Sequence, residues 1–157
     1  MRPGAPGGWD RGFDSPTAGG TLGTVRIYLA AAMTHTGRDL DAIKMLLECL
    51  EADGHEVPTR HVAEAQGREA DGALSDAQVA SRDLDWVARC DAFVAEVSTP
   101  SHGVGVEVAA ALARGKPVLL VYRRGTPVSR LLLGLRGAQE LAYGDAAEMR
   151  EGVRSFY

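Results

Sequence analysis

Two acidic residues occupy positions at which a helix would turn an apolar face toward the protein interior. Asp83 follows Val79 by one helical turn, and Glu107 lies at helical spacing between Val104 and Val108. A carboxylate on such a face is costly unless it is paired or used in chemistry. Paired carboxylates in different environments are the usual means of glycosidic-bond cleavage, because one attacks or stabilises the sugar cation while the other moves protons. The spacing therefore indicates a pair of this kind.

A structural role for the two carboxylates stays open, because an arginine such as Arg60 or Arg82 could neutralise either one. Glu107 lies in the first turns of its predicted helix, where the helix dipole favours an ionised side chain and so suits a nucleophile better than an acid. Tyr28 lies near the carboxyl end of an apolar segment. Its hydroxyl is expected either at the same site or bonded to the backbone of the core.

A loop of small residues, Thr99 to Gly105, leads into the helix that carries Glu107. Backbone N–H groups at a helix N-terminus favour an anion, so the loop predicts phosphate binding around Ser101, Gly103 and Gly105. It is not a Walker loop, because no Gly-Lys-Ser/Thr follows, and the dinucleotide-binding glycine pattern is absent after the first predicted strand.

The histidines, at positions 35, 55, 61 and 102, lack the spacing of a two-ligand helical motif. Neither a metal site nor a cofactor is therefore expected. His61 follows the second predicted strand, where it could orient a substrate or be an ordinary loop residue.

The hydrophobic pattern alternates strands with helices along most of the chain. Strands are predicted over residues 25–31, 55–58, 91–97, 118–122 and 139–142. Helices are predicted from Thr36 or Asp39 to Gly54 and over residues 75–89, 103–115, 126–135 and 145–156, with a long loop over 60–74. Such alternation implies right-handed crossovers and a mostly parallel sheet covered on both faces. Ligands of such sheets bind beyond the carboxyl ends of the strands, so the loops after the first four strands are expected to form one cleft.

The composition favours one domain, expected over residues 24–157 of the 157-residue chain. Residues 1–23 are rich in Gly, Pro, Ser, Thr and Asp without a hydrophobic period, which predicts a disordered N-terminal arm. The net charge of −4 argues against nucleic acid or a membrane surface as a partner. Two cysteines, no apolar run that could span a bilayer and no signal-peptide core favour a reduced, cytoplasmic protein.

Five characteristic segments follow one another between residues 25 and 143. They are Ile27-Tyr28-Leu29, His61-Val62-Ala63, Arg82-Asp83-Leu84-Asp85-Trp86, residues 92–96, and Pro100-Ser101-His102-Gly103-Val104-Gly105-Val106-Glu107. In this order and spacing they resemble the 2′-deoxynucleoside 5′-phosphate N-hydrolases of the nucleoside 2-deoxyribosyltransferase superfamily. The resemblance implies an α/β, flavodoxin-like or Rossmann-like three-layer sandwich with a five-stranded, mostly parallel sheet. It also implies a dimeric enzyme that hydrolyses the N-glycosidic bond of a deoxynucleoside 5′-monophosphate to the free base and 2-deoxyribose 5-phosphate.

The resemblance implies catalytic roles for three residues. Glu107 matches the nucleophile, which forms a glycosyl-enzyme ester at the anomeric carbon. Asp83 matches the acid that contacts the sugar and assists proton transfer. Tyr28 matches a tyrosine near the 2′ position, where exclusion of a 2′-hydroxyl can favour deoxyribose.

The phosphate-binding part of the resemblance contains a departure. Ser101 and Gly103 match the phosphate loop, and Ser129 matches a phosphate-binding serine of the neighbouring subunit, which implies a homodimer with shared active sites. The loop after the first strand often reads Gly-Ser-Ile-Arg-Gly-Gly in the family. Here it reads Ala31-Ala-Met-Thr-His-Thr-Gly37, so Thr34 stands at the arginine position.

Arg38 and Arg130 are the candidates to replace the missing arginine, and Met33 is expected to line the base pocket. Three alternatives remain beside the deoxynucleotide hydrolase: a ribonucleotide hydrolase of the cytidine monophosphate type, a nucleoside 2-deoxyribosyltransferase, and a nucleotide-binding module without turnover. The combination of Glu107, Asp83 and Tyr28 weighs against the last, because a binder of anions has no need of an inward carboxylate.

Overall fold

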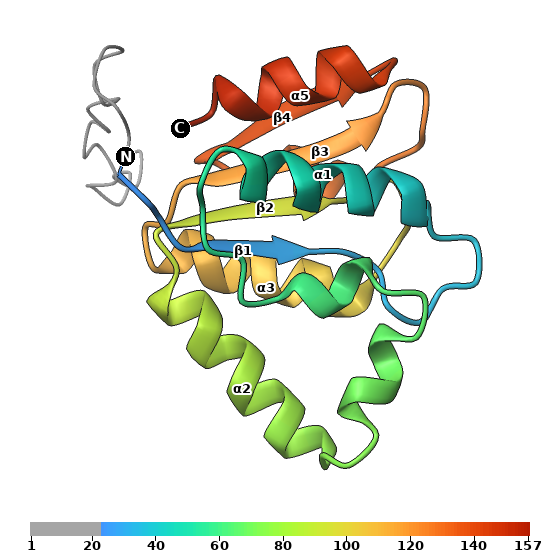
Figure 1. Ribbon diagram of the computed structural model, residues 1–157, viewed down its shortest axis with the longest axis vertical. Coiled ribbons are helices and arrows are strands. Elements are labelled where there is room, and N and C mark those ends of the chain that lie inside the picture. The colour runs from blue at the N-terminus through green and yellow to red at the C-terminus, as the bar shows by residue number, and fades with distance from the viewer. Residues whose placement is uncertain (1–22) are drawn as a thin grey trace, which may run out of the picture.

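A parallel sheet forms the centre of the computed structural model, which describes residues 23–157. Its strands, in spatial order, are β1 (Ile27–Ala30), β2 (Ala92–Glu96), β3 (Val118–Arg123) and β4 (Ala138–Tyr143). Every neighbouring pair is parallel (Figure 1). The register places Ile27 opposite Ala92 and Phe93 opposite Val118. All but the last residue of the arm predicted over residues 1–23 lies outside the described residues.

The predicted second strand is the main difference from the expected five-stranded sheet. In the described part of the chain it is reduced to an isolated parallel bridge between Arg26 and Glu56. Pairing stops there because Pro58 has no N–H to donate, and the next residue takes over the free edge of β1 with its side chain. Thr59 Oγ1 accepts from Leu29 N at 3.0 Å and donates to Leu29 O at 2.7 Å.

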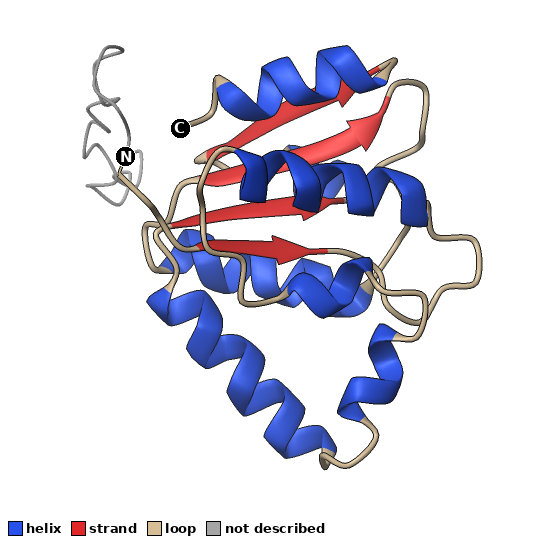
Figure 2. Cartoon of the chain, in the orientation of Figure 1, coloured by secondary structure: helices blue, strands red, loops and turns tan. Residues whose placement is uncertain are grey.

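Helices cover both faces of the sheet (Figure 2). One face, with Ile27 and Leu29, packs against α1 (Leu40–Ala52) and α5 (Ala146–Arg154). The other, with Tyr28 and Phe93, packs against α3 (His102–Ala113) and the C-terminal end of α2 (Asp76–Arg89). Successive strand residues point to opposite faces, so both faces of β1 and β2 are buried. The expected three-layer parallel α/β sandwich is confirmed.

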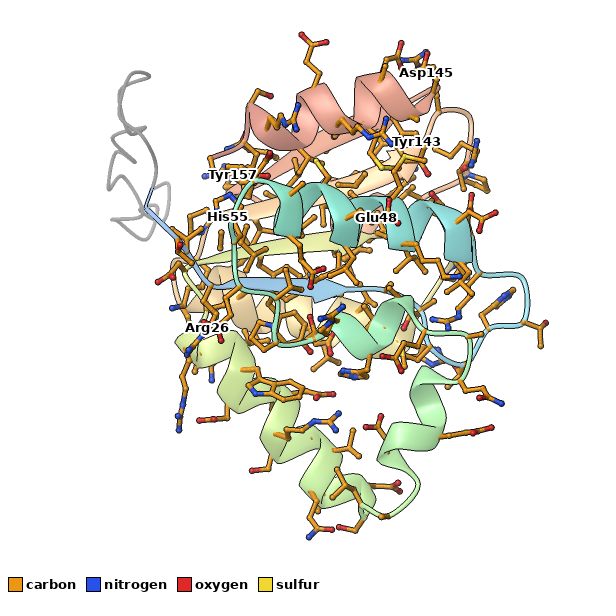
Figure 3. The ribbon with its side chains drawn as sticks, in the orientation of Figure 1. Arg26, Glu48, His55, Tyr143, Asp145 and Tyr157 are labelled. Carbon is orange, nitrogen blue, oxygen red and sulfur yellow. The ribbon has the colours of Figure 1, made fainter. Side chains whose placement is uncertain are left out.

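The predicted helix boundaries depend on caps that are present. The Asp39 side chain accepts from Ala42 N at 3.0 Å and begins α1. Ser75 and Gln78 form the predicted capping box of α2, and Asp145, which begins α5, is labelled in Figure 3. Gly115 has a φ of 67°, which ends α3 at the glycine expected for that position.

Two predicted segments differ in the structure. The loop over 60–74 contains the short 3-10 helices η1 (Arg60–Ala63) and η2 (Gly67–Asp71). The helix predicted over 126–135 is shorter, because α4 is confined to Arg130–Leu133. A residue before proline is disfavoured in helical conformation, and Pro127 with the extended Ser129 delays the start of α4.

Gly67 lies at a close contact between η1, η2 and the loop after β1. A Cβ atom there would lie 2.0 Å from His61 O and 2.9 Å from Met33 Cε. Because a backbone carbonyl cannot move aside cheaply, Gly67→Ala is expected to lower the free energy of unfolding by about 1–3 kcal/mol in urea titrations. Gly105→Ala is the control, because a Cβ at this helical glycine meets nothing within 4 Å and should be neutral or stabilising by about 1 kcal/mol. Equal stability of the two variants would contradict the close contact.

The C-terminus is held beside the segment that forms the isolated bridge. The Tyr157 ring meets the buried His55 ring edge-on at a centroid distance of 4.3 Å (Figure 3). In the described part of the chain no helix is both long enough and apolar enough to cross a membrane.

Candidate active site

A cavity of about 670 Å³ lies between α2, α3 and the loop after β1. The loop contributes Ala31, Met33 and Thr34, and η2 with its following turn contributes Asp71 and Gly72. The remaining lining residues come from α2 and the turn before it and from the N-terminal part of α3 with its cap: Leu74, Asp76, Val79, Ala80, Asp83, Leu84, Ser101, His102, Gly103, Val104, Val106 and Glu107. The cavity therefore lies at the predicted edge of the sheet, although the loop after β3 contributes no lining residue.

Glu107 and Tyr28 meet at the sheet side of this cavity. The Tyr28 hydroxyl donates a hydrogen bond of 2.7 Å to Glu107 Oε1, and the tyrosine ring stacks on Phe93 at a centroid distance of 5.1 Å. Among the described residues no other side-chain hydrogen bond reaches the Glu107 carboxylate, so Oε2 is free to face a ligand. Of the two placements expected for the tyrosine hydroxyl, the structure has the one at the site.

Burial raises the pKa of Glu107 to about 7. The hydrogen bond from Tyr28 and the positive charge of Arg82 lower this pKa, whereas the negative charge of Asp83 raises it further. Burial thus opposes the helix dipole, which by itself favours the ionised side chain. Burial also raises the pKa of Tyr28, which therefore remains a hydrogen-bond donor.

Asp83 lines the same cavity from α2, and its partner is the preceding residue. Arg82 donates to Asp83 Oδ1 through Nε at 2.9 Å and Nη2 at 2.8 Å. Arg60 instead pairs with Glu51 at the surface, at 3.5 Å. An arginine therefore does pair with Asp83, as the sequence allowed. Its bonds occupy only one carboxylate oxygen, and Asp83 still lines the cavity.

The N-terminus of α3 closes the cavity at the expected phosphate loop. Ser101 Oγ accepts from Val104 N at 3.3 Å. A Cβ atom at Gly103 would meet nothing closer than Ser101 Oγ at 3.8 Å, so the space in front of this turn is open. Gly105 lies in the same turn of the helix but does not line the cavity.

Arg38 does not take the place of the missing phosphate-loop arginine. Its guanidinium donates to the carbonyl oxygens of Val62 at 2.7 Å, Ala32 at 3.3 Å and Glu64, and it does not line the cavity. Arg130, the other candidate, begins α4 and does not line it either. Among the described lining residues, the basic side chain is that of His102.

Two further residues of the predicted site lie outside the cavity. His61 is on η1, and its ring packs at 5.9 Å from the Trp86 ring. Ser129 is the exposed N-cap of α4. Within this chain the cavity is lined by Glu107 and Asp83 and by further predicted residues, namely Met33, Thr34, Ser101 and Gly103. Tyr28 does not line it but contacts Glu107 through its hydroxyl.

The apolar wall of the cavity was missed by the sequence analysis. Val79 and Ala80 line it from α2, and the exposed Val106 lines it from α3. A signal was present, because residues three and four positions before Asp83 share its helical face.

Among the described residues, no group of three or more His, Cys, Asp and Glu side chains is arranged to hold a metal ion.

Glu107 and Asp83, two of the four carboxylates that line this cavity at the carboxyl edge of the sheet, have the arrangement expected of an enzyme that acts on glycosidic bonds. The family model described as nucleoside 2-deoxyribosyltransferase matches residues 27–149, and the chain belongs to this family.

Similar proteins agree with this assignment. A 2′-deoxynucleoside 5′-phosphate N-hydrolase 1 of Thermofilum pendens is 37% identical over 83% of this chain and 94% of its own. The 5-hydroxymethyl-dUMP N-hydrolase of Mus musculus is 34% identical over 83% of this chain and 78% of its own. The structure of Clostridium botulinum CMP N-glycosidase, BcmB, superposes with a TM-score of 0.63 at 24% identity, covering 84% of this chain and 99% of that one. This last likeness shows the shared fold.

Proposed function

We propose that this protein is an N-glycosidase that hydrolyses nucleoside 5′-monophosphates to the free base and a sugar 5-phosphate. The observation that carries the proposal is the contact of Tyr28 with Glu107, which lines the same cavity as Asp83. Membership of the family and the names of the relatives, which are N-hydrolases of deoxynucleotides, support the same reaction.

The proposed reaction has two steps. Ionised Glu107 attacks the anomeric carbon through Oε2 while the bond to the base breaks, because Oε1 is occupied by the Tyr28 hydroxyl. The departing base takes up a proton, a transfer that we assign to Asp83. Water then attacks the anomeric carbon of the ester, returns a proton to Asp83 and releases both the sugar phosphate and the Glu107 carboxylate.

We place the substrate phosphate at the N-terminus of α3, where Ser101, His102 and Gly103 line the cavity. Four carboxylates line the same cavity, those of Asp71, Asp76, Asp83 and Glu107, so an anion is accommodated best at this N-terminal end. A homodimer in which Ser129 of a second copy reaches this phosphate belongs to the proposal, because Ser129 does not reach the cavity of its own chain. We place the protein in the cytoplasm.

A panel of ribo- and deoxyribonucleoside 5′-monophosphates, separated by chromatography after incubation with the protein, tests the function. We expect release of free base, with deoxyribonucleotides ahead of ribonucleotides, because Tyr28 beside the attacking carboxylate would crowd a 2′-hydroxyl. A new nucleoside formed when an acceptor base is added would identify a transferase instead. Calorimetric binding without release of any base would identify a binding module and overturn the proposal.

Removing the Tyr28 hydroxyl should slow turnover and shift its pH dependence. In Tyr28→Phe the hydrogen bond that lowers the Glu107 pKa is lost, so the acid limb of the kcat/KM profile should move above pH 7. We expect kcat to fall by about 10–100-fold. Tyr122→Phe is a matched control, because the Tyr122 hydroxyl donates a hydrogen bond of 2.9 Å to Glu140 at an exposed site. An acid limb that is the same in both variants would contradict the role of the contact.

A further inference from the structure

We propose that Arg82 is a positioning residue for this reaction. Its guanidinium orients the Asp83 carboxylate and holds η2, which forms one wall of the cavity, at a fixed distance from Asp83. The inference rests on the proposed function, because it acts through the proton transfer assigned to Asp83. Arg82 itself does not line the cavity.

The guanidinium bridges two elements that are separate in the chain. Its Nε and Nη2 donate to Asp83 Oδ1 at 2.9 and 2.8 Å, and its Nη1 donates to Asp71 Oδ1, at the end of η2, at 2.6 Å. Asp71 and Asp83 both line the cavity. One planar cation therefore sets the distance between a wall of the cavity and the carboxylate that we assign to proton transfer.

The same contacts select which oxygen of Asp83 meets the ligand. Both bonds from Arg82 end on Oδ1, and none of the hydrogen bonds among the described residues reaches Oδ2. With Oδ1 held, the rotation of the carboxylate is fixed and Oδ2 is the oxygen left to exchange protons. A loss of this restraint would misplace the reacting oxygen without removing it.

Trp86 packs against the Arg82 guanidinium. Arg82 Cζ lies 4.8 Å from the centroid of the indole, and the His61 ring lies 5.9 Å from the same indole. A cation over an aromatic face is attracted by the electrons of the ring, more strongly when water is excluded. His61, which was predicted in the site, thus packs against Trp86, the residue that contacts Arg82, and does not line the cavity.

Burial separates this bridge from an ordinary surface ion pair. The side chains of Arg82, Asp71 and Asp83 are 24, 21 and 22% exposed. On the same helix, Arg89 pairs with Asp85 at 3.0 Å, but these side chains are 67 and 51% exposed. Arg89→Gln is therefore a matched control that removes an arginine and an ion pair from α2 away from the cavity.

The experiment measures kcat, KM and pH profiles of base release for Arg82→Gln, Arg82→Lys, Asp71→Asn and Arg89→Gln, with thermal unfolding of each. We expect Arg82→Gln to lower kcat by about 100-fold, a loss typical of a reacting group displaced by about 1 Å. Arg82→Lys retains the positive charge but lacks the planar guanidinium with its several N–H donors. Its kcat should therefore stay at about a tenth of the wild-type kcat or less. Asp71→Asn, which leaves Asp83 held, should lower kcat less than tenfold, and Arg89→Gln should change it less than twofold.

The pH profile supplies a readout that a purely structural role would not move. The groups that face Glu107 are Tyr28, Asp83 and Arg82, and the charge of Arg82 lowers the Glu107 pKa. The acid limb should therefore move above pH 7 in Arg82→Gln and stay in place in Arg89→Gln. If the wild type releases base but Arg82→Gln and Arg89→Gln have the same kcat and the same acid limb, this inference is overturned and the proposed function is not. A wild type that releases no base from any nucleotide would overturn the proposed function and the inference with it.

Discussion

Glu107→Gln is expected to abolish base release, with kcat lowered by about 10³-fold or more. Glutamine keeps the shape of the side chain and can still accept the 2.7 Å hydrogen bond from Tyr28 through its amide oxygen. It cannot form the sugar ester, because a neutral amide is a poor nucleophile. The measurement is chromatographic base release from the best substrate of the nucleotide panel. Glu140→Gln is the matched control, because Glu140 accepts a tyrosine hydroxyl at an exposed site outside the cavity.

The same variant should be more stable than the wild type above neutral pH. Folding raises the Glu107 pKa from 4.5 to about 7 because of burial. Between these values the folded state binds more protons than the unfolded state, so the wild-type free energy of unfolding falls as the pH rises. Glutamine carries no charge and escapes this loss. We expect its Tm to exceed that of the wild type by about 3–8 °C at about pH 8, with a smaller difference at about pH 5.

These two readouts separate chemistry from folding. An inactive variant with a raised Tm at high pH shows that a buried ionisable group was removed from an intact fold. Wild-type turnover by Glu107→Gln on every nucleotide tested would rule out the carboxylate as nucleophile. A Tm difference that does not vary with pH would instead contradict the raised pKa.

Asp83→Asn should lower kcat by about 10²–10⁴-fold, the range of a lost general acid or base. Asparagine can keep the hydrogen bonds from Arg82 with its Oδ1, so the variant removes the exchangeable proton and leaves the bridge in place. The negative charge of Asp83 raises the Glu107 pKa. The acid limb of the residual activity should therefore move below pH 7, opposite to the shift in Tyr28→Phe.

Asp85→Asn is the control for this experiment, because Asp85 lies two residues further along α2 in an exposed pair with Arg89. If kcat of Asp83→Asn remained within about threefold of the wild type, proton transfer would have to be assigned elsewhere. An acid limb that moved upward would show that Asp83 acts on Glu107 through structure and not through its charge.

The sequence by itself determined which face each residue occupies. The helical spacing around Asp83 and Glu107 predicted that both turn inward, and the structure places both on one cavity. The cap residues Asp39 and Ser75 and the apolar strands indicated the elements and the parallel direction of the strands, and the structure has both. Such signals are local, because the period of a helix or a strand and the bonds of its caps involve residues within a few positions of one another.

Only the tertiary structure decided which groups become partners. The hydroxyl of Tyr28 reaches a carboxylate 79 residues away, and Thr59 replaces a strand at the edge of the sheet. Arg38, a candidate to bind the substrate phosphate, instead donates its hydrogen bonds to loop carbonyls. Arg82 bridges Asp71 and Asp83. A side chain donates to the acceptors that the assembled elements bring within about 3 Å, and this competition among distant segments has no period in the sequence.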